Sequence, residues 1–301
     1  MLIKEIGTLT EGIHLTGISI FPITLIDIER PVLFEGGVAC VANKYISDIR
    51  NILAGRSPEI IFLTHAHWDH CGAVSAIKKA FPSIKVAASQ QSADILKKKS
   101  AVDIITKLNA DEIATTAQEC DPELLTSDPF EPFEIDIILK DGDIVDIGDT
   151  LKVEVIATPG HTRDHLSYYI PSKKILFACE AAGAFDSPEG DVLVEFVSGY
   201  EPYLSSLKRI STIPVDILFQ GHRIVFKGKE EAEKFLKRSL EATLFFKTRI
   251  DELLSENGDD IDIVANKIKT EIYDPLPPPK QPESIYMINL RAQIAHLLSI
   301  K

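Results

Sequence analysis

The most informative segment of the chain is Thr64-His65-Ala66-His67-Trp68-Asp69-His70-Cys71-Gly72. It contains three imidazoles and one carboxylate within six positions, although the chain has only eight histidines in 301 residues. Chance would produce His-x-His-x-Asp-His in such a chain with a probability on the order of one in a few thousand, so we set aside a polar loop with accidental histidines. Imidazole nitrogens combined with a carboxylate oxygen favour a catalytic divalent metal over a closed structural site.

This segment follows the apolar run Ile60-Ile61-Phe62-Leu63, which is short and partly β-branched and is therefore expected to form a buried strand. The histidines then lie on the loop at the C-terminal end of the strand, where α/β proteins build their sites. A spacing of two places His65 and His67 on the same side of an extended segment, so both can bind one metal. Asp69 and His70 precede the next expected helix, point elsewhere, and can hold a second ion about 3.5 to 4 Å from the first.

The histidine segment resembles the hallmark motif of the metallo-β-lactamase superfamily. Three later motifs resemble the remaining ligand motifs of that superfamily and occur in its order: Thr158-Pro159-Gly160-His161-Thr162, Leu176-Phe177-Ala178-Cys179-Glu180 and Gln220-Gly221-His222. The resemblance extends over roughly residues 10–225. It implies an α/β fold, namely a four-layer αββα sandwich, here with a helical insertion and a C-terminal helical extension.

The resemblance also implies a site with two divalent metal ions, for which zinc is the first expectation and iron the second, since both accept these ligands. The implied ligands are His65, His67, Asp69, His70, His161, Glu180 and His222. Glu180 departs from the superfamily, because most members have an aspartate there that bridges the two metals. One extra methylene adds roughly 1.5 Å of reach. We expect Glu180 to coordinate, with an unbound carboxylate behind the ligands as the alternative.

The function implied is that of a metal-dependent hydrolase, in which a metal-bridging hydroxide attacks the carbonyl of a small thioester, lactone or other ester. Asp69 would be the catalytic residue that orients this nucleophile and passes a proton to the leaving group. The alternative is a metal-binding regulatory protein of the same fold that acts through partner contacts. It stays open because the insertion and the tail are similar to those of the quinolone-signal response proteins, the subgroup that this chain resembles most.

Periodicity and turn residues predict two parts of the chain. Residues 1–225 are expected to form the metallo-β-lactamase domain, with a helical insertion at about 89–133 that either covers the site or only packs. Residues 226–301 are expected to form a C-terminal extension of long amphipathic helices, which either folds over the site or only packs. Within the domain, Asp141-Gly142 is expected to be the turn of a β-hairpin.

Several titratable residues have a plain structural interpretation beside a functional one. Glu35 precedes two glycines and is expected in a surface turn. His165 matches no ligand position of the superfamily, so both hydrogen bonding behind the ligands and plain packing stay open. His14 and His296 lie in apolar surroundings without partners nearby in the sequence, and we assign them to the structure. Cys179 is expected to be a small buried residue.

Composition limits the partners. The formal charge of −13 argues against a nucleic acid, because phosphate binding needs clustered lysines and arginines. The four cysteines form no Cys-x-x-Cys pair, the first residues have no apolar core of a signal peptide, and no apolar run approaches transmembrane length. We therefore expect a cytoplasmic protein with a small-molecule substrate, without a nucleic-acid or membrane partner, and leave a homodimer open.

Overall fold

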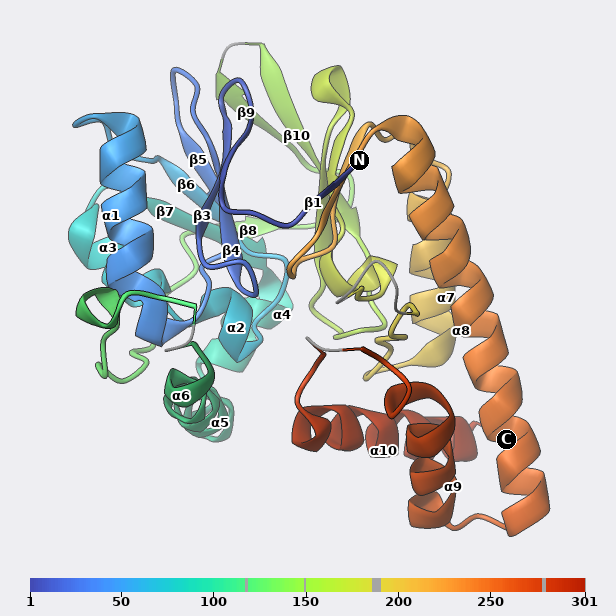
Figure 1. The fold of residues 1–301 in the computed structure, drawn as a ribbon. Helices are drawn as coiled ribbons and strands as arrows, with labels where there is room; N and C mark the ends of the chain where they lie inside the picture. The colour runs from blue at the N-terminus through green and yellow to red at the C-terminus, as the bar shows by residue number, and fades with distance from the viewer. Residues whose placement is uncertain (117–118, 149, 186–190, 278–279, 301) are drawn as a thin grey trace. The chain divides into compact units, whose positions relative to one another are not determined.

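The structure is a computed structural model that describes residues 1–116, 119–148, 150–185, 191–277 and 280–300 (Figure 1). The described chain forms two compact units. We call residues 3–157 with 166–173 the N-terminal unit, and residues 1–2, 158–165 and 174–301 the C-terminal unit. The domain boundary that the sequence suggests at residue 225 stays a prediction.

The N-terminal unit contains a seven-stranded sheet whose strands follow their order in the sequence. These strands are β2 (Gly7–Thr10), β3 (Ile13–Gly17), β4 (Pro22–Ile26), β5 (Val32–Phe34), β6 (Ile60–Phe62), β7 (Lys85–Ser89) and β8 (Ile137–Leu139). Strands β2 to β5 pair antiparallel, and β5 to β8 pair parallel. The parallel strands β5 and β6 are buried throughout, as expected for strands covered on both faces.

Helices cover one face of this sheet, and a second set of strands covers the other. Helix α1 (Ala42–Leu53) buries Tyr45 in a cluster that includes Leu33 and Ile61 of the sheet, and α3 (Val74–Ala80) joins the same cluster (Figure 1). Phe34 and Phe62 point to the opposite face, because side chains alternate along a strand. There they contact the ring of Tyr168, at centroid distances of 5.8 and 5.2 Å.

Tyr168 belongs to an antiparallel group of three strands within the same unit. The group consists of β9 (Ile144–Gly148), β10 (Leu151–Ala157) and β11 (Leu166–Ile170), with β10 paired to both neighbours. All five residues of β11 are buried. Strand β11 therefore packs on β5 and β6 and fixes the position of the loop that follows β6.

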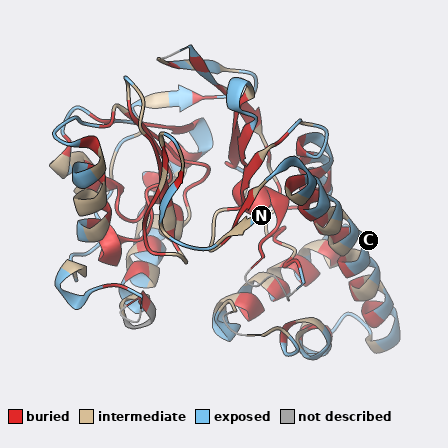
Figure 2. Cartoon of the chain, turned by 45° about the horizontal axis from the view of Figure 1, so that its top comes forward, coloured by how far each residue is buried: buried red, intermediate tan, exposed pale blue. Residues whose placement is uncertain are grey.

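The C-terminal unit combines short strands with long helices. Strand β12 (Ile175–Phe177) pairs parallel with β13 (Ile217–Phe219), which pairs antiparallel with β14 (Val225–Lys227). The helices are α7 (Tyr200–Ile210), α8 (Lys229–Asn257), α9 (Ile261–Ile268) continued by a π-helical turn (Lys269–Tyr273), and α10 (Glu283–Ser299). In Figure 2, buried and exposed residues alternate along α8, as its amphipathic sequence predicts. No helix in the described part of the chain is long and apolar enough to cross a bilayer.

The structure confirms the helical character of the insertion. Its helices are α4 (Gln90–Leu96), α5 (Lys99–Asp111) and α6 (Ile113–Thr116), and the Ser89 hydroxyl caps α4 by accepting a hydrogen bond from the Ser92 amide at 3.0 Å. Residues 122–124 form one short 3-10 turn, and the rest of the described segment up to residue 133 is loop, as the prolines and aspartates predict. The predicted helical segment ends at Gln118, which lies outside the described residues.

The predicted hairpin at Asp141-Gly142 is wrong. The chain does turn there, but β8 pairs parallel with β7, and β9 pairs with β10. Turn chemistry indicates only a local reversal. Which strands then pair is decided by the surfaces that they bury, and these surfaces put β8 beside β7.

Asp136 provides a test of the N-terminal sheet. Its carboxylate accepts hydrogen bonds from Lys78 Nζ at 2.6 Å and from the Val86 amide at 2.8 Å. Burial opposes ionisation, but these hydrogen bonds outweigh it and lower the pKa of Asp136 from its ordinary 3.8. A carboxyl with a lowered folded pKa stabilises the fold above its ordinary pKa, and this stability is lost as pH falls through the folded value.

Asp136→Asn should therefore cost about 1 kcal/mol of unfolding free energy at neutral pH, a modest figure because the pair is partly exposed. We expect the difference from wild type to shrink in acid below the ordinary aspartate value. Urea unfolding at neutral and acid pH measures it, with Asp128→Asn as the matched exposed control. An equal deficit at both pH values would contradict the assignment.

Candidate metal centre

Strand β11 holds the start of the histidine loop. The Tyr168 hydroxyl donates to the Leu63 carbonyl at 2.6 Å, and the Leu166 amide donates to the Thr64 carbonyl at 2.8 Å. Both bonds are buried in the N-terminal unit, where they compete with little water. The two residues between β6 and the first histidine are therefore fixed before the loop begins.

His65 and His67 lie side by side on this loop. The His65 side chain is 0% exposed, its Nδ1 is 3.0 Å from the Thr64 hydroxyl, and its ring centroid is 4.5 Å from that of His67. One ligand nitrogen of His65 and one of His67 lie within 4.8 Å of each other. Because Thr64 occupies Nδ1, the Nε2 atom of His65 is the nitrogen that can bind a metal.

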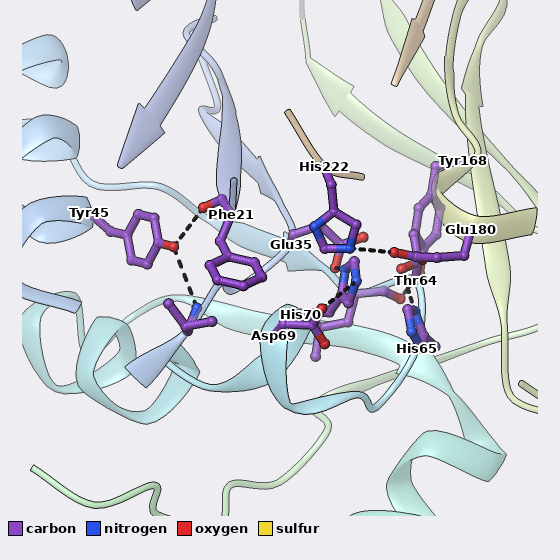
Figure 3. A network of polar contacts seen from close by, with 12 residues as sticks. Phe21, Glu35, Tyr45, Thr64, His65, Asp69, His70, Tyr168, Glu180 and His222 are labelled. Carbon is purple, nitrogen blue, oxygen red and sulfur yellow. Dashed lines mark hydrogen bonds and ion pairs between the residues drawn. The ribbon is translucent and has the colours of Figure 1, made fainter. Parts of the chain in front are cut away.

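Asp69 and His70, expected just before the next helix, lie in a short helix of their own, α2 (Trp68–Cys71). Figure 3 shows His70 with Asp69 on one side and Glu35 on the other. Its Nε2 is 3.8 Å from an Asp69 oxygen, and its Nδ1 is 3.2 Å from a Glu35 oxygen. One ligand oxygen of Asp69 and one ligand nitrogen of His70 lie within 4.8 Å of each other.

Glu35 corrects a sequence prediction. It is only 6% exposed and lies in no surface turn, with a backbone φ of 73° that is uncommon for a residue other than glycine. The Gly36 amide donates to the His70 carbonyl at 2.7 Å, which ties this bend to α2. A carboxylate against Nδ1 fixes the orientation of an imidazole and leaves Nε2 for a metal. The available signal was an acidic residue directly after a buried strand.

Asn109, on insertion helix α5, is a second residue that the sequence did not reveal. Its side-chain oxygen accepts the Ala39 amide at 2.7 Å, and its side-chain nitrogen donates to the Trp68 carbonyl at 3.2 Å. Asn109 is 3% exposed, and its hydrogen bond with the Ala39 amide is buried. The insertion therefore packs on α2 and helps to place the residues that carry Asp69 and His70.

In the C-terminal unit, His161 projects from a tight turn. Gly160 has φ +133°, and a Cβ at this position would lie 2.2 Å from the Tyr203 Cα, so only glycine fits. His161 Nδ1 lies 2.7 Å from the Glu195 carbonyl, which can only accept, so Nδ1 carries the proton. In the neutral ring, Nε2 is then unprotonated and able to bind a metal.

Glu180 and His222 converge from the ends of neighbouring strands. Glu180 lies in a 3-10 turn (Cys179–Ala182) after β12, and His222 follows β13. A Glu180 oxygen and His222 Nε2 are 2.7 Å apart (Figure 3). Gly221 has φ +99°, and a Cβ there would come within 3.2 Å of the same Glu180 oxygen. The longer glutamate thus reaches His222 within this unit.

His165 lies behind this pair. Its Nδ1 is 2.8 Å from the Thr158 hydroxyl, and its ring is 1% exposed. A His165 nitrogen and a Glu180 oxygen lie within 4.8 Å of each other. Which of the two interpretations that the sequence left open holds for His165 stays a prediction.

The donor set fits a divalent metal. His65, His70, Glu180 and Glu35 are at most 6% exposed, and such buried polar groups are stable when paired or when they bind an ion. Imidazole nitrogens and carboxylate oxygens are the ligands of catalytic zinc, and iron accepts them too. His65, His67, Asp69 and His70 belong to the N-terminal unit, and His161, Glu180 and His222 to the C-terminal unit. That both sets bind the same ions stays a prediction.

The histidines assigned to structure have partners that the sequence did not show. His14 Nδ1 is 3.0 Å from the Thr8 hydroxyl, and His296 Nε2 accepts the Tyr200 amide at 3.0 Å. The latter satisfies an amide in the first turn of α7, where the helix has no side-chain cap. Cys179 is buried as expected.

Comparison with known proteins was made on sequence and on structure. The sequence model of the metallo-beta-lactamase superfamily matches residues 29–222. A hydroxyacylglutathione hydrolase of Thermosynechococcus vestitus is 31% identical over 123 residues, 41% of this chain and 34% of that protein. A beta-lactamase-like protein 2 homolog of Caenorhabditis elegans is 29% identical over 219 residues, 70% of this chain and 60% of that protein. A metallo-beta-lactamase family protein of Thermus thermophilus aligns with a TM-score of 0.62 at 16% identity, over 97% of this chain and 92% of that one.

These matches cover different fractions of the proteins that are compared. The structural likeness covers nearly the whole chain and confirms the expected α/β fold, two sheets flanked by helices with further helices at the C-terminal end. The two curated relatives are matched over 34% and 60% of their own lengths. What those proteins do is therefore no more than a guide to this chain.

Proposed function

The chain belongs to the metallo-beta-lactamase superfamily, and from this premise we propose that it is a metal-dependent hydrolase of a small thioester, lactone or other ester. We propose that His65, His67 and His161 hold one divalent ion and that Asp69, His70 and His222 hold a second, with Glu180 contributing to both. Zinc is the first expectation for the metal and iron the second. The C-terminal extension and the insertion are proposed to select the substrate.

One observation carries this proposal. A Glu180 oxygen and His222 Nε2 meet at 2.7 Å, with Glu180 only 4% exposed, at the ends of two parallel strands. Burying a carboxylate is costly unless a partner or a cation compensates it. The ends of parallel strands are also where α/β proteins place their catalytic groups. The pair thus supports a metal-binding role for a position where most superfamily members have aspartate.

Divalent ions supply Lewis acidity and make water acidic enough to be a nucleophile near neutral pH. The residues of the chain supply orientation and proton transfer. The Asp69 carboxylate is proposed to accept the proton of the attacking water and to return it to the leaving group. Glu35 and Thr64 hold Nδ1 of His70 and of His65, and the Glu195 carbonyl holds Nδ1 of His161, which keeps each Nε2 in position.

The substrate class is supported by the relatives and by charge. Hydroxyacylglutathione hydrolases, by their name, hydrolyse acylated glutathione, and several match this chain at 26–31% identity. The formal charge of −13 supports a small-molecule substrate over a nucleic acid. Cytoplasmic location and a homodimer stay predictions. Membership of the quinolone-signal response subgroup stays one as well, supported by the helices of the insertion and of the tail.

The test combines metal analysis with an assay. Elemental analysis of protein purified without added metal should find about two divalent ions per chain, the number that a binuclear site holds. The same preparation should hydrolyse members of a panel of thioesters and lactones. The His67→Ala variant should be inactive, which excludes a contaminating enzyme. Bound metal without turnover across the panel would instead support the alternative, a regulatory protein of the same fold.

A further inference from the structure

Gln220 follows strand β13 in the C-terminal unit, and its side chain is 0% exposed. Its Nε2 donates one hydrogen bond of 2.8 Å to the Phe185 carbonyl and another of 2.8 Å to the His222 carbonyl. The proposed function does not use this glutamine, although it belongs to the same short motif as His222. One buried side chain thus links the backbone of a candidate ligand to a segment 35 residues away in the sequence.

The orientation of the Gln220 amide follows from its partners. Both partners are carbonyl oxygens, which can only accept, so the amide nitrogen must face them. Its Oε1 is then buried without a hydrogen-bond partner among the described residues. An unpaired buried acceptor costs stability, and an apolar side chain would fill the same space without that penalty. The glutamine is therefore better explained by the two carbonyls that it holds than by packing.

The Phe185 carbonyl is a rigid anchor for this side chain. Phe185 is buried, and its ring contacts Phe226 of β14 and Phe235 of α8 at centroid distances of 5.9 and 6.0 Å. Those two rings stack on each other at 4.2 Å. Ala184, the preceding residue, is held in an isolated β-bridge. Because close-packed interiors allow little movement, Gln220 is tied to a fixed point.

The backbone around His222 needs such a tie. Gly221 and Arg223, on either side of His222, have φ angles of +99° and +50°. A residue other than glycine is strained in this left-handed region and stays there only when its surroundings hold it. The contact of His222 Nε2 with a Glu180 oxygen at 2.7 Å depends on this reversal. The bond from Gln220 to the His222 carbonyl holds the reversal at its centre.

We propose that Gln220 positions His222 for the second metal ion, by tying the His222 carbonyl to the buried Phe185 segment. This inference rests on the proposed function, because it takes His222 as a metal ligand. It goes further by assigning to a neutral side chain, which touches neither metal nor substrate, the affinity for one of the two ions. His161 is held by the Glu195 carbonyl instead, so the first ion should not depend on Gln220.

The test titrates the full-length, metal-free protein with zinc in competition with a chromophoric chelator. Gln220→Met keeps the length of the side chain and removes both donors. It should weaken the binding of one ion by about 10- to 100-fold, the usual effect of losing a group that orients a ligand, and leave the other ion unchanged. Gln220→Asn keeps the amide but is too short to hold both carbonyls. It should weaken the same ion, and it replaces Gln220→Met should that variant not fold.

Thr243→Val is the matched control within the same unit. Thr243 is fully buried too, and its hydroxyl donates to the Ser239 carbonyl at 2.7 Å within α8. The variant loses a buried donor to a backbone carbonyl, and it should bind both ions as wild type does. In Gln220→Met the His222 carbonyl keeps its bond from the Ile224 amide. The melting temperatures of the two variants should therefore lie within about 4 °C of each other.

A crystal structure of metal-free Gln220→Met separates this inference from the proposed function, because it needs neither metal nor turnover. The Glu180 oxygen and His222 Nε2 should lie beyond hydrogen-bonding distance in the variant. An unchanged contact there, wild-type affinity for both ions, or equal weakening in Thr243→Val would overturn the role of Gln220 and leave the proposed function in place. Wild-type protein that binds no metal would instead overturn the proposed function, and with it the role of Gln220 in metal binding.

Discussion

Glu180→Ala is expected to lower the bound metal from about two ions per chain to about one, and to reduce turnover roughly 100-fold or more. The reason is the contact that Glu180 makes: its oxygen lies 2.7 Å from His222 Nε2, and the Glu180 side chain is buried. Without it, one imidazole of this unit loses its carboxylate neighbour. Elemental analysis and the thioester and lactone assay measure the two effects.

Two further variants make this result specific. Glu180→Asp restores the carboxylate that most superfamily members have, one methylene shorter, and should recover part of the metal content. Glu201→Ala, an exposed glutamate in the first turn of α7, should change neither quantity. If Glu180→Ala still held two ions per chain, the bridging role would be wrong, although the other ligands could stand.

Gly160→Ala is expected to destabilise the protein by about 3–5 kcal/mol, or to prevent folding of the C-terminal unit. A Cβ here would lie 2.2 Å from the Tyr203 Cα and 2.3 Å from its amide nitrogen, and backbone atoms cannot move aside as a flexible side chain can. The φ of +133° adds strain for any residue with a Cβ. Thermal melting should show a fall of roughly 10 °C or more.

The Gly7→Ala variant separates the cost of backbone strain from the cost of a steric clash. Gly7 has nearly the same φ, +132°, but a Cβ there would meet nothing within 4 Å. Its substitution should cost only the strain, about 1 kcal/mol. Similar losses in the two variants would show that the approach to Tyr203 contributes nothing. Any folded Gly160→Ala protein should also bind metal more weakly, because the turn that projects His161 would shift.

Several elements of the fold and several candidate ligands could be predicted from the sequence. The apolar run Ile60–Leu63 predicted β6, and amphipathic periodicity predicted the helices of the C-terminal extension such as α8, because burial imposes that periodicity on the sequence. The resemblance to the superfamily likewise selected His161, Glu180 and His222 as candidates, and within their unit Glu180 and His222 are in contact. Residue type and spacing are enough when the chemistry itself requires them.

Other features depend on contacts between residues far apart in the chain. The partner of β8 is β7 rather than β9, although the turn at Asp141-Gly142 suggested a hairpin. Glu35 and Asn109 lie 35 and 41 residues from His70 and Trp68, and their own neighbourhoods do not show which residues they contact. Only the folded chain brings such groups together.

The sequence by itself determined the donor chemistry, the order of the ligand motifs, and the helices and strands whose periodicity reflects burial. The tertiary structure alone decided which strands pair and that Glu35 is buried against His70. The physical reason is the separation along the chain between the residues that interact. Periodicity and motif spacing record interactions within a few residues, whereas burial and hydrogen-bond partners depend on surfaces that meet only after the chain has folded.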